Sequence, residues 1–185
     1  MPQRHHHLPR LPRRFYNRNV LEVARDLLGM ALVRRMENGH TVRARIVETE
    51  AYGGPRDRAS HAYRGKTLRN AAMFGSPGHA YIYFTYGMHW LLNVVAEPAG
   101  DPAAVLIRGV DVLEQLPSRL SGPARVTKYL QISGSLNAED LVRSPHLWIE
   151  RSQDPRGARR VTRTPRIGVD YAGAAARWHR RFLLL

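Results

Sequence analysis

The sequence predicts an α+β fold, in which one domain has a central, largely antiparallel β-sheet flanked by short helices. Strand-like runs outnumber helical ones, and the first two runs meet at a hairpin signal. Only short segments have the spacing and capping residues of helices. The 185 residues are 43% hydrophobic, enough for one core, and contain neither an internal repeat nor a linker long enough to divide the chain.

The predicted helices are short. The first covers residues 20–28, where apolar side chains recur with helical spacing and Asn19 can cap the first turn. A second follows Gly122-Pro123 as far as residue 130, because proline is favoured at the first helical position. Asn137 is expected to cap a short third helix.

The predicted strands begin with residues 30–35 and 41–49, which flank Asn38-Gly39, the dipeptide most typical of a tight hairpin turn. Alternating or apolar runs predict further strands over residues 80–85, 90–96, 103–112, 147–150 and 167–169. Residues 53–78 are rich in Gly, Pro and Arg and lack periodicity. They are expected to form a long ordered loop, a kind of segment that often carries function.

Two glutamates stand at the end of the second strand. Val42, Ala44 and Ile46 share one parity, and the same parity continues to Glu48 and Glu50, so both carboxylates would follow the line of an apolar face. A carboxylate there is costly unless it is paired, hydrated in a cleft or used in chemistry. The alternative is that the strand ends at Val47 and both glutamates are solvated.

The chain is strongly basic. It has 29 Lys and Arg against 15 Asp and Glu, a net charge of +14 and a pI of about 11.2. Such a field attracts polyanions, most commonly nucleic acid, although a basic and inert surface is the alternative. Residues 1–14 are expected to form a flexible basic arm before a domain over residues 15–185, and the residues from Arg151 onward form a second basic flank.

Several functional classes lack their signatures. The absence of cysteine excludes disulfides, thiolate metal sites and thiol nucleophiles. The core histidines lack metal-ligand spacing, and no lipase elbow, phosphate loop or dinucleotide fingerprint occurs, so neither a metal nor another cofactor is expected. No apolar run approaches the length of a membrane span, and no signal-peptide core is present, so we expect a protein of the bacterial cytoplasm.

Aromatic side chains are concentrated between Tyr81 and Trp90, which hold five of the fifteen in the chain. In a basic protein such a cluster can supply faces on which nucleobases stack; core packing is the alternative. Because strand alternation would bury several hydroxyl groups, at least one tyrosine is expected to line a cleft. Tyr86, just before Gly87, is expected to project outward at a strand end.

Spaced motifs occur in a fixed order along the chain. They are Arg45-Ile46-Val47-Glu48-Thr49-Glu50-Ala51-Tyr52, Ala59-Ser60-His61, Arg69-Asn70, Met73-Phe74, Tyr81-Ile82-Tyr83-Phe84-Thr85-Tyr86-Gly87-Met88, Asn93, Ala104-Val105-Leu106-Ile107-Arg108, Ser121-Gly122-Pro123 and Thr164-Pro165-Arg166-Ile167-Gly168-Val169-Asp170-Tyr171-Ala172-Gly173. With this set the sequence resembles the alkyladenine (3-methyladenine) DNA glycosylase family from about residue 11 to residue 182. The resemblance implies that family's fold, with a curved sheet.

The resemblance also implies roles for individual residues. Glu50 would be the general base that activates water, and Arg108 would support the site around it. The damaged base would be held by Tyr52, His61 and Tyr83, with Asn93 at the pocket floor. Tyr86 would be the wedge that fills the gap left in the duplex.

These roles agree with the chemistry of base excision. The anomeric carbon cannot be reached inside stacked duplex, so the nucleotide must be extruded and held by aromatic walls. Hydrolysis then passes through an oxocarbenium-like state that a carboxylate can stabilise while it accepts a proton from water. An alkylated purine that already carries positive charge is attracted to electron-rich rings.

Contacts to the DNA backbone are expected from a further set of residues near the cleft. For each Lys or Arg among them, the alternative is a solvated cation that makes no contact with DNA. They are Lys66, Thr67, Arg69, Met88, Arg125 and Lys128.

The sequence departs from the family pattern at a few places. The segment between Arg108 and Ser121 is shorter than usual, Leu68 stands where proline often precedes Arg-Asn, Ala174 replaces a glutamate, and Trp178-His179 replaces Lys-Pro. We expect these changes to affect affinity and substrate range more than chemistry.

The resulting hypothesis is a monomeric, monofunctional DNA glycosylase of base excision repair, associated with the nucleoid. It would excise alkylated or deaminated purines (3-methyladenine, 7-methylguanine, hypoxanthine and ethenoadenine) from double-stranded DNA and leave an abasic site. One alternative is a non-catalytic protein that binds damaged or structured nucleic acid on the same scaffold. Another is a formyltransferase-like accessory domain that binds RNA, against which the Glu-Ala-Tyr string and Tyr86 argue.

Overall fold

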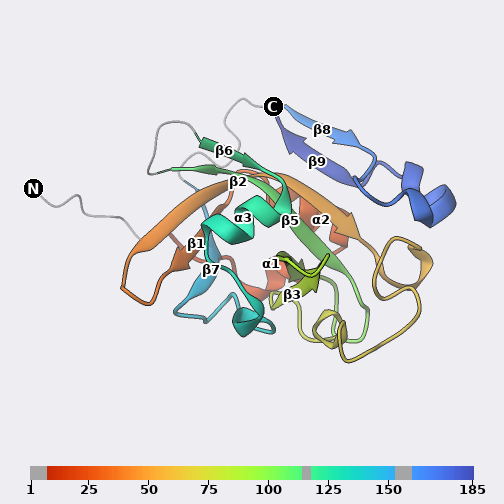
Figure 1. Ribbon diagram of the computed structural model, residues 1–185, viewed down its shortest axis with the longest axis horizontal. Coiled ribbons are helices and arrows are strands. Elements are labelled where there is room, and N and C mark those ends of the chain that lie inside the picture. Colours follow the sequence, from red (N-terminus) through yellow and green to blue (C-terminus); the bar gives the residue numbers. More distant parts are fainter. Residues whose placement is uncertain (1–7, 114–117, 153–159) are drawn as a thin grey trace, which may run out of the picture.

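The computed structural model describes residues 8–113, 118–152 and 160–185. Within these ranges nine strands form one curled antiparallel sheet with a few short helices, which confirms the predicted α+β class (Figure 1). Along its main path the sheet has the strand order β3-β4-β5-β2-β1-β7, with β6 paired to β5 and with β9 joining β8 to β2.

The strands and helices have the following bounds. The strands are β1 (Ala31–Arg35), β2 (Thr41–Tyr52), β3 (Ala80–Thr85), β4 (His89–Val95), β5 (Ala104–Val112), β6 (Ser118–Ser121), β7 (Leu147–Glu150), β8 (Val161–Thr164) and β9 (Arg181–Leu184). The helices are α1 (Arg13–Tyr16), α2 (Val20–Asp26) and α3 (Pro123–Tyr129), and the 3₁₀ turns are η1 (Gly54–Arg56), η2 (Ala71–Phe74), η3 (Gly134–Leu136) and η4 (Asp170–Arg177).

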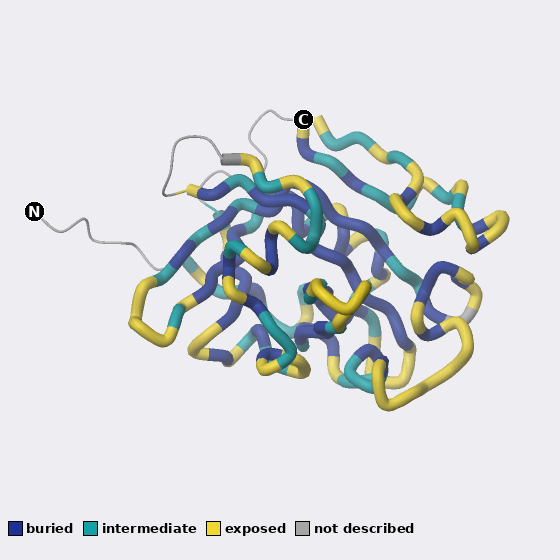
Figure 2. Tube along the Cα trace, in the orientation of Figure 1, coloured by how far each residue is buried: buried dark blue, intermediate teal, exposed yellow. Residues whose placement is uncertain are grey.

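The main core lies between the sheet and the helices α2 and α3. The long central strands β2 and β5 are almost wholly buried (Figure 2). Helix α2 contributes Val23 and Ala24 to this core and α3 contributes Val126, so each helix buries one apolar stripe. Both helices begin as predicted: Asn19 Oδ1 accepts a hydrogen bond from the N–H of Leu21 at 3.0 Å, and Pro123 follows Gly122, whose φ is +103°.

Strand β2 is longer than predicted, and its ladder with β5 contains two register shifts. Ile46 pairs with Val110 and Thr49 with Ile107, while between them Glu48 faces Gly109. The extra residues are Val47 on β2 and Arg108 on β5. Such bulges turn the side chains that follow to the opposite face of the strand.

Because of the bulge, the two glutamates neither follow the apolar face nor lie in solvent, so both predicted alternatives are wrong. Before it, Val42, Ala44 and Ile46 face the core; after it, Val47 and Ala51 do so instead. The Thr49 hydroxyl also points to that side, where it donates to the carbonyl of Ala24 at 2.8 Å. Glu48 and Glu50 therefore leave the apolar face, yet they are only 5% and 0% exposed, so the solvated alternative is wrong as well.

Several shorter elements differ from the prediction. Residues 167–169 are not a strand but lead into η4, and Asn137 follows η3 rather than capping a helix, because its Oδ1 accepts from the N–H of Ile82. The elements α1, β6, β8 and β9 were not predicted, since each is only four residues long and has no clear periodicity.

The expected basic arm reaches the folded body before residue 14. Leu11 is 1% exposed and its N–H donates to the carbonyl of Ile149, and Arg13 forms an ion pair with Asp140 at 2.6 Å. Residues 8–14 thus pack against the domain, while residues 1–7 lie outside the described ranges.

The long loop between β2 and β3 is ordered around one buried amide. Asn70, 2% exposed, donates to the carbonyls of His61 and Gly65 at 2.8 and 3.0 Å and accepts from the N–H of Thr67 at 2.6 Å. Hydrogen bonds of one side chain therefore fix the part of the loop that carries His61.

The shortened segment after Arg108 is a pair of strands. β5 continues to Val112 and pairs with β6, with Val110 opposite Leu120, and residues 114–117 between them are not described. No helix in the described part of the chain is long and apolar enough to cross a membrane.

Gly78 gives a test of how tightly α1 packs on the sheet. Its φ is +78°, and a Cβ there would lie 2.6 Å from the ring of the fully buried Tyr16. Gly78→Ala is expected to lower the free energy of unfolding by about 2–4 kcal/mol, from backbone strain plus overpacking.

Gly39→Ala is the matched control in denaturant unfolding. Gly39 has a φ of +82° with open space around its Cβ position, so strain alone should cost about 1 kcal/mol. Equal losses in the two variants would show that the Tyr16 ring moves aside and that its packing is not tight.

Candidate active site

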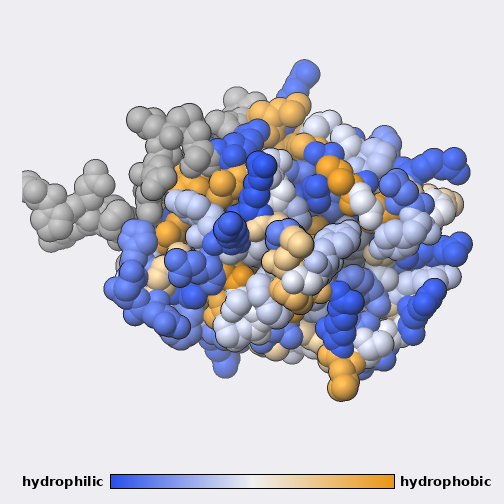
Figure 3. All heavy atoms as spheres, viewed as in Figure 1, coloured by the Kyte–Doolittle hydropathy of each residue, from blue (hydrophilic) through white to orange (hydrophobic). Residues whose placement is uncertain are grey.

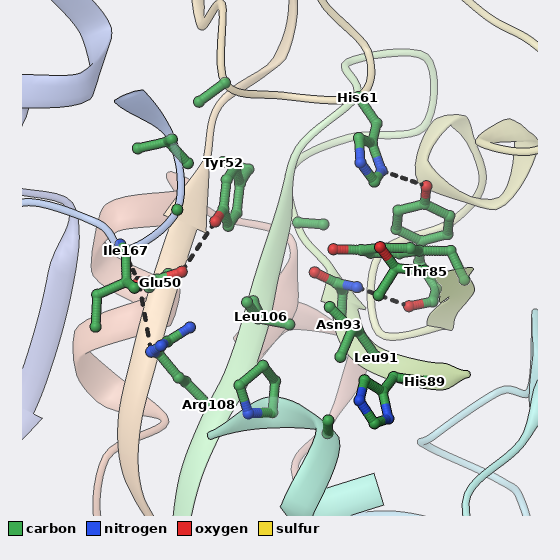
Figure 4. Close-up of a pocket in the computed structure, with 18 of the residues that line it drawn as sticks. Glu50, Tyr52, His61, Thr85, His89, Leu91, Asn93, Leu106, Arg108 and Ile167 are labelled. Carbon is green, nitrogen blue, oxygen red and sulfur yellow. Dashed lines mark hydrogen bonds and ion pairs between the residues drawn. The ribbon is translucent and has the colours of Figure 1, made fainter. Parts of the chain in front are cut away.

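A cavity of about 400 Å³ opens on the face of the sheet opposite the main core. It is lined by all seven residues for which the sequence suggested catalytic, base-holding or wedge roles: Glu50, Tyr52, His61, Tyr83, Tyr86, Asn93 and Arg108. Glu50, Tyr52 and Arg108 gather on one side of the cavity, and His61 and Asn93 on the other (Figure 4).

The floor of the cavity is a row of residues across four strands. Tyr81 on β3 pairs with Asn93 on β4, Asn93 pairs with Leu106 on β5, and Leu106 pairs with Glu50 on β2. Residues directly opposite each other in a ladder share a face, so all four line the same cavity. The antiparallel register therefore brings together residues that are far apart in the chain.

Glu50 is completely buried and both its carboxylate oxygens are hydrogen-bonded. Oε2 accepts from the Tyr52 hydroxyl at 2.9 Å, and Oε1 accepts from the N–H of Ile167 at 2.9 Å. The guanidinium Nε of Arg108 lies 3.7 Å from Oε1. The carboxylate is thus fixed from three directions, two of them visible in Figure 4 as contacts from Tyr52 and Arg108.

Burial raises the pKa of Glu50 above its ordinary value. The charge of Arg108 and the hydrogen bonds from Ile167 and Tyr52 oppose this shift, while the nearby Glu48 adds to it. A group in this environment is a carboxylate with enhanced basicity, which suits proton abstraction.

Arg108 is shared between two carboxylates. Its Nε lies 3.0 Å from Glu48 Oε1, closer than to Glu50, and Glu48 also accepts from Arg181 Nε at 2.6 Å. Arg108 is the extra residue of the β5 bulge, and this position turns its side chain toward β2. Gly109 leaves the room, since a Cβ there would lie 2.9 Å from Glu48 Cβ.

The aromatic side of the cavity consists of Tyr81, Tyr83 and His61. The His61 and Tyr83 rings meet edge to face with centroids 4.5 Å apart, and His61 Nδ1 shares a hydrogen bond of 2.8 Å with the Tyr81 hydroxyl. Burial, helped by the charge of Arg69, lowers the pKa of His61 and so favours the neutral ring at pH 7. Burial raises the pKa of Tyr81 to about 12, so its hydroxyl stays protonated.

Asn93 is 3% exposed at the cavity floor. Its Nδ2 donates to the carbonyl of Tyr81 at 3.0 Å, which fixes the amide orientation (Figure 4).

The turn between β3 and β4 carries Tyr86 at the mouth of the cavity. Tyr86 has a φ of +52°, which residues other than glycine rarely adopt, and its side chain is exposed, since the residue is 84% accessible. The neighbouring Met88 is 68% exposed. A strained turn that holds a large apolar side chain in solvent is typical of a functional site.

The expected backbone-contacting residues all lie at the surface. Lys66, Thr67 and Arg69 are exposed on the long loop, Met88 lies beside Tyr86, and Arg125 and Lys128 are exposed on α3. Arg69 is also held in place, because it donates to the carbonyl of Phe84 at 2.9 Å. Hydrophilic side chains project around much of the face shown in Figure 3.

Several residues of the site had no role predicted from the sequence. Tyr81 and Ile167 contact His61 and Glu50, and Glu48 anchors Arg108. Arg166 lies with its guanidinium carbon 4.7 Å from the centre of the Tyr52 ring. The only signal for Arg166 and Ile167 was their place in the Thr164–Gly173 motif. Among the described residues, no group of three His, Asp or Glu side chains could hold a metal ion.

The chain matches known proteins over almost its whole length. The family model described as methylpurine-DNA glycosylase (MPG) matches residues 14–184. A protein of Methanocella arvoryzae is 47% identical over 182 residues, which cover 91% of this chain and 89% of that protein. A protein of Carboxydothermus hydrogenoformans is 48% identical over 172 residues, covering 86% and 88%, and one of Myxococcus xanthus is 48% identical over 168 residues, covering 90% and 85%.

All three relatives carry the name "Putative 3-methyladenine DNA glycosylase". Since the family model and these relatives cover most of the chain, the buried carboxylate, the aromatic cavity and the exposed tyrosine belong to a member of the methylpurine-DNA glycosylase family.

Proposed function

We propose that this protein is a monofunctional DNA glycosylase that flips damaged purines out of double-stranded DNA and hydrolyses their N-glycosidic bond. The observation that carries the proposal is the buried, hydrogen-bonded carboxylate of Glu50 in the wall of an aromatic cavity. A protein that only binds nucleic acid has no need of such a carboxylate, whose burial is costly.

In this mechanism Glu50 accepts a proton from the attacking water. The water's oxygen forms a bond to the anomeric carbon as the bond from that carbon to the base nitrogen breaks and the base leaves with the bonding electrons. The negative charge of Glu50 also stabilises the oxocarbenium-like sugar. Arg108 helps to keep the carboxylate ionised. Because water is the nucleophile and no amine attacks the sugar, the product is an abasic site and the strand stays intact.

The cavity is suited to hold a flipped purine. Tyr52, His61 and Tyr83 offer ring faces and edges, and a volume of about 400 Å³ is within the usual range for small-molecule sites. A purine methylated at N3 or N7 carries positive charge and gains from these rings. Hypoxanthine and ethenoadenine are the neutral candidate substrates, and excision of a neutral base needs protonation of the leaving group as well.

Tyr86 is proposed to enter the duplex where the nucleotide has left. Lys66, Thr67, Arg69, Met88, Arg125 and Lys128 would contact the backbone around it. A single copy has all the residues assigned to the cavity, so we propose that the protein acts as a monomer. Since its proposed substrate is DNA, we also place it in the nucleoid of the bacterial cytoplasm.

Glu50→Gln is expected to reduce base release by at least about 100-fold while lesion binding is retained. The amide can keep both contacts of Glu50, because the Tyr52 hydroxyl can accept from its NH₂ while its oxygen accepts from Ile167. The measurement is release of bases from methylated DNA and from duplexes with one hypoxanthine or one ethenoadenine.

Glu37→Gln, which changes an exposed glutamate in the first hairpin, is the control and should leave release unchanged. Undiminished release by Glu50→Gln would remove Glu50 as the base. No release by the parent from any of these duplexes, with tight lesion binding, would favour the non-catalytic binding protein.

Tyr86→Ala is expected to weaken flipping by about 1–3 kcal/mol, roughly 5- to 150-fold, because an aromatic side chain that stacks in the gap is lost. Fluorescence of 2-aminopurine placed opposite the lesion measures the opening. Tyr86→Phe keeps the ring and should behave like the parent; a full signal from Tyr86→Ala would count against the wedge role.

Excision of 7-methylguanine should fall in acid with a midpoint above 4.5, the ordinary pKa of a glutamate side chain. The sign follows from burial: a raised pKa means that Glu50 becomes protonated, and inactive, at a higher pH as the solution is acidified. The cationic base needs no acid catalysis, so single-turnover rates report this carboxylate alone. A midpoint at or below 4.5 would contradict the assignment.

A further inference from the structure

A buried ion pair lies behind the Tyr52 wall of the cavity. Arg166 and Asp57 have side-chain exposures of 0%, and the guanidinium donates to both carboxylate oxygens, with 2.8 Å between Arg166 Nη2 and Asp57 Oδ1. Burial alone would raise the pKa of Asp57, but hydrogen bonds and charge from Arg166, with N–H groups of the loop, hold it below its usual value.

Arg166 joins three segments that meet at the cavity. Its Nη1 donates to the carbonyl of Ala51 on β2 at 2.9 Å, and its Nη2 donates to the carbonyl of Ala175 in η4 at 3.1 Å. Asp57 belongs to the loop after β2, where it accepts from the N–H groups of Gly53 and Ala59. The planar fork of an arginine can make all these bonds at once, which a lysine cannot.

The ion pair is a costly way to fill this space. Burial of two charges costs several kcal/mol per ion before their attraction offsets it, and well-packed apolar side chains often serve stability equally well. Arg166 Nε, moreover, is buried without a hydrogen-bond partner in the described structure. The contacts of Arg166 with the site supply a reason for the pair beyond folding.

Through its neighbours, Arg166 is connected to both carboxylate oxygens of Glu50. The guanidinium stacks 4.7 Å from the centre of the Tyr52 ring, and the Tyr52 hydroxyl donates to Glu50 Oε2. The backbone that carries Arg166 continues to Ile167, whose N–H donates to Glu50 Oε1. One anchored side chain therefore fixes the two donors that hold the carboxylate.

We infer that Arg166, locked by Asp57, is a positioning residue of the glycosylase site, which orients Tyr52 and the Ile167 peptide so that Glu50 stays aimed at the attacking water. This inference rests on the proposed function of Glu50. Arg166 does not line the cavity, so it acts through its neighbours: the Tyr52 ring, the Ile167 peptide and the β2 backbone at Ala51.

Arg166→Lys is the informative variant, since it keeps a cation against Asp57 but loses the fork and the stacked plane. We expect a loss of about tenfold or more in the single-turnover rate at neutral pH, because the carboxylate is no longer aimed. We also expect an acid limb shifted to higher pH by about one unit, because donors that favour the ionised form are loosened. Arg166→Gln should show the same changes with a larger loss of stability.

Arg180→Gln is the matched control. Arg180 is the second cation on Asp57, at 3.4 Å, and its guanidinium stacks on Trp178, away from Tyr52. This variant should lower the melting temperature and leave the acid limb unchanged.

The other charged and titratable groups around Glu50 are Arg108 on β5, Glu48 and Tyr52 on β2, Tyr83 on β3, and Arg181 on β9, which pairs with Glu50 and binds Glu48. None of them is altered in these variants.

A direct titration of Glu50 separates this inference from the proposed function. The ¹³C shift of its carboxyl carbon, assigned with Glu50→Gln, reports ionisation in the free protein whether or not any base is released. A higher midpoint in Arg166→Lys than in both the parent and Arg180→Gln would support the positioning role. Equal midpoints, or a rate loss that only follows the loss of folded protein, would overturn it.

Discussion

A carboxylate held away from water is the constraint on which the rest of this structure depends. Glu50 is fully buried, and without partners it would take up a proton and lose the charge that its proposed role as general base requires. Its surroundings compensate with one nearby cation and two hydrogen-bond donors, which come from β5, from β2 itself and from the loop before η4. The pKa of Glu50 nevertheless stays above its ordinary value, so this carboxylate is a stronger base than a glutamate in solvent.

The paired bulges in β2 and β5 make this arrangement compatible with a hydrophobic core. A regular strand would turn Glu48 and Glu50 to the apolar side and Val47, Thr49 and Ala51 away from it. The shift exchanges the two sets, and the compensating extra residue on β5 is Arg108, which then faces both glutamates. The paired bulges therefore turn the two glutamates out of the core and also supply the cation, Arg108, that lies against them.

Much of the fold could be predicted, since long periodic segments such as β2, β3, β5 and α2 have strong local signals. The bulge could not, because alternation extrapolates a single parity and a register shift depends on the partner strand. The seven principal site residues follow from the family motifs, and they do line one cavity. The pairing of Arg166 with Asp57 could not be predicted, because the Thr164–Gly173 motif gives Arg166 no partner and an ion pair between residues 109 positions apart leaves no periodic pattern.

Strand β9 pairs with β2 where the two glutamates lie, with Glu50 opposite Arg181, and Arg181 also binds Glu48 across 133 positions of sequence. During synthesis the segment around Glu50 therefore leaves the ribosome long before the strand that covers it. Contacts so distant in sequence also form slowly in folding, because a long stretch of chain must first be closed into a loop. The order of translation thus delays completion of the site until nearly the whole described chain is available. A nascent fragment without β9 contains Glu48 and Glu50 but lacks the strand and the Arg181 cation that lie against them.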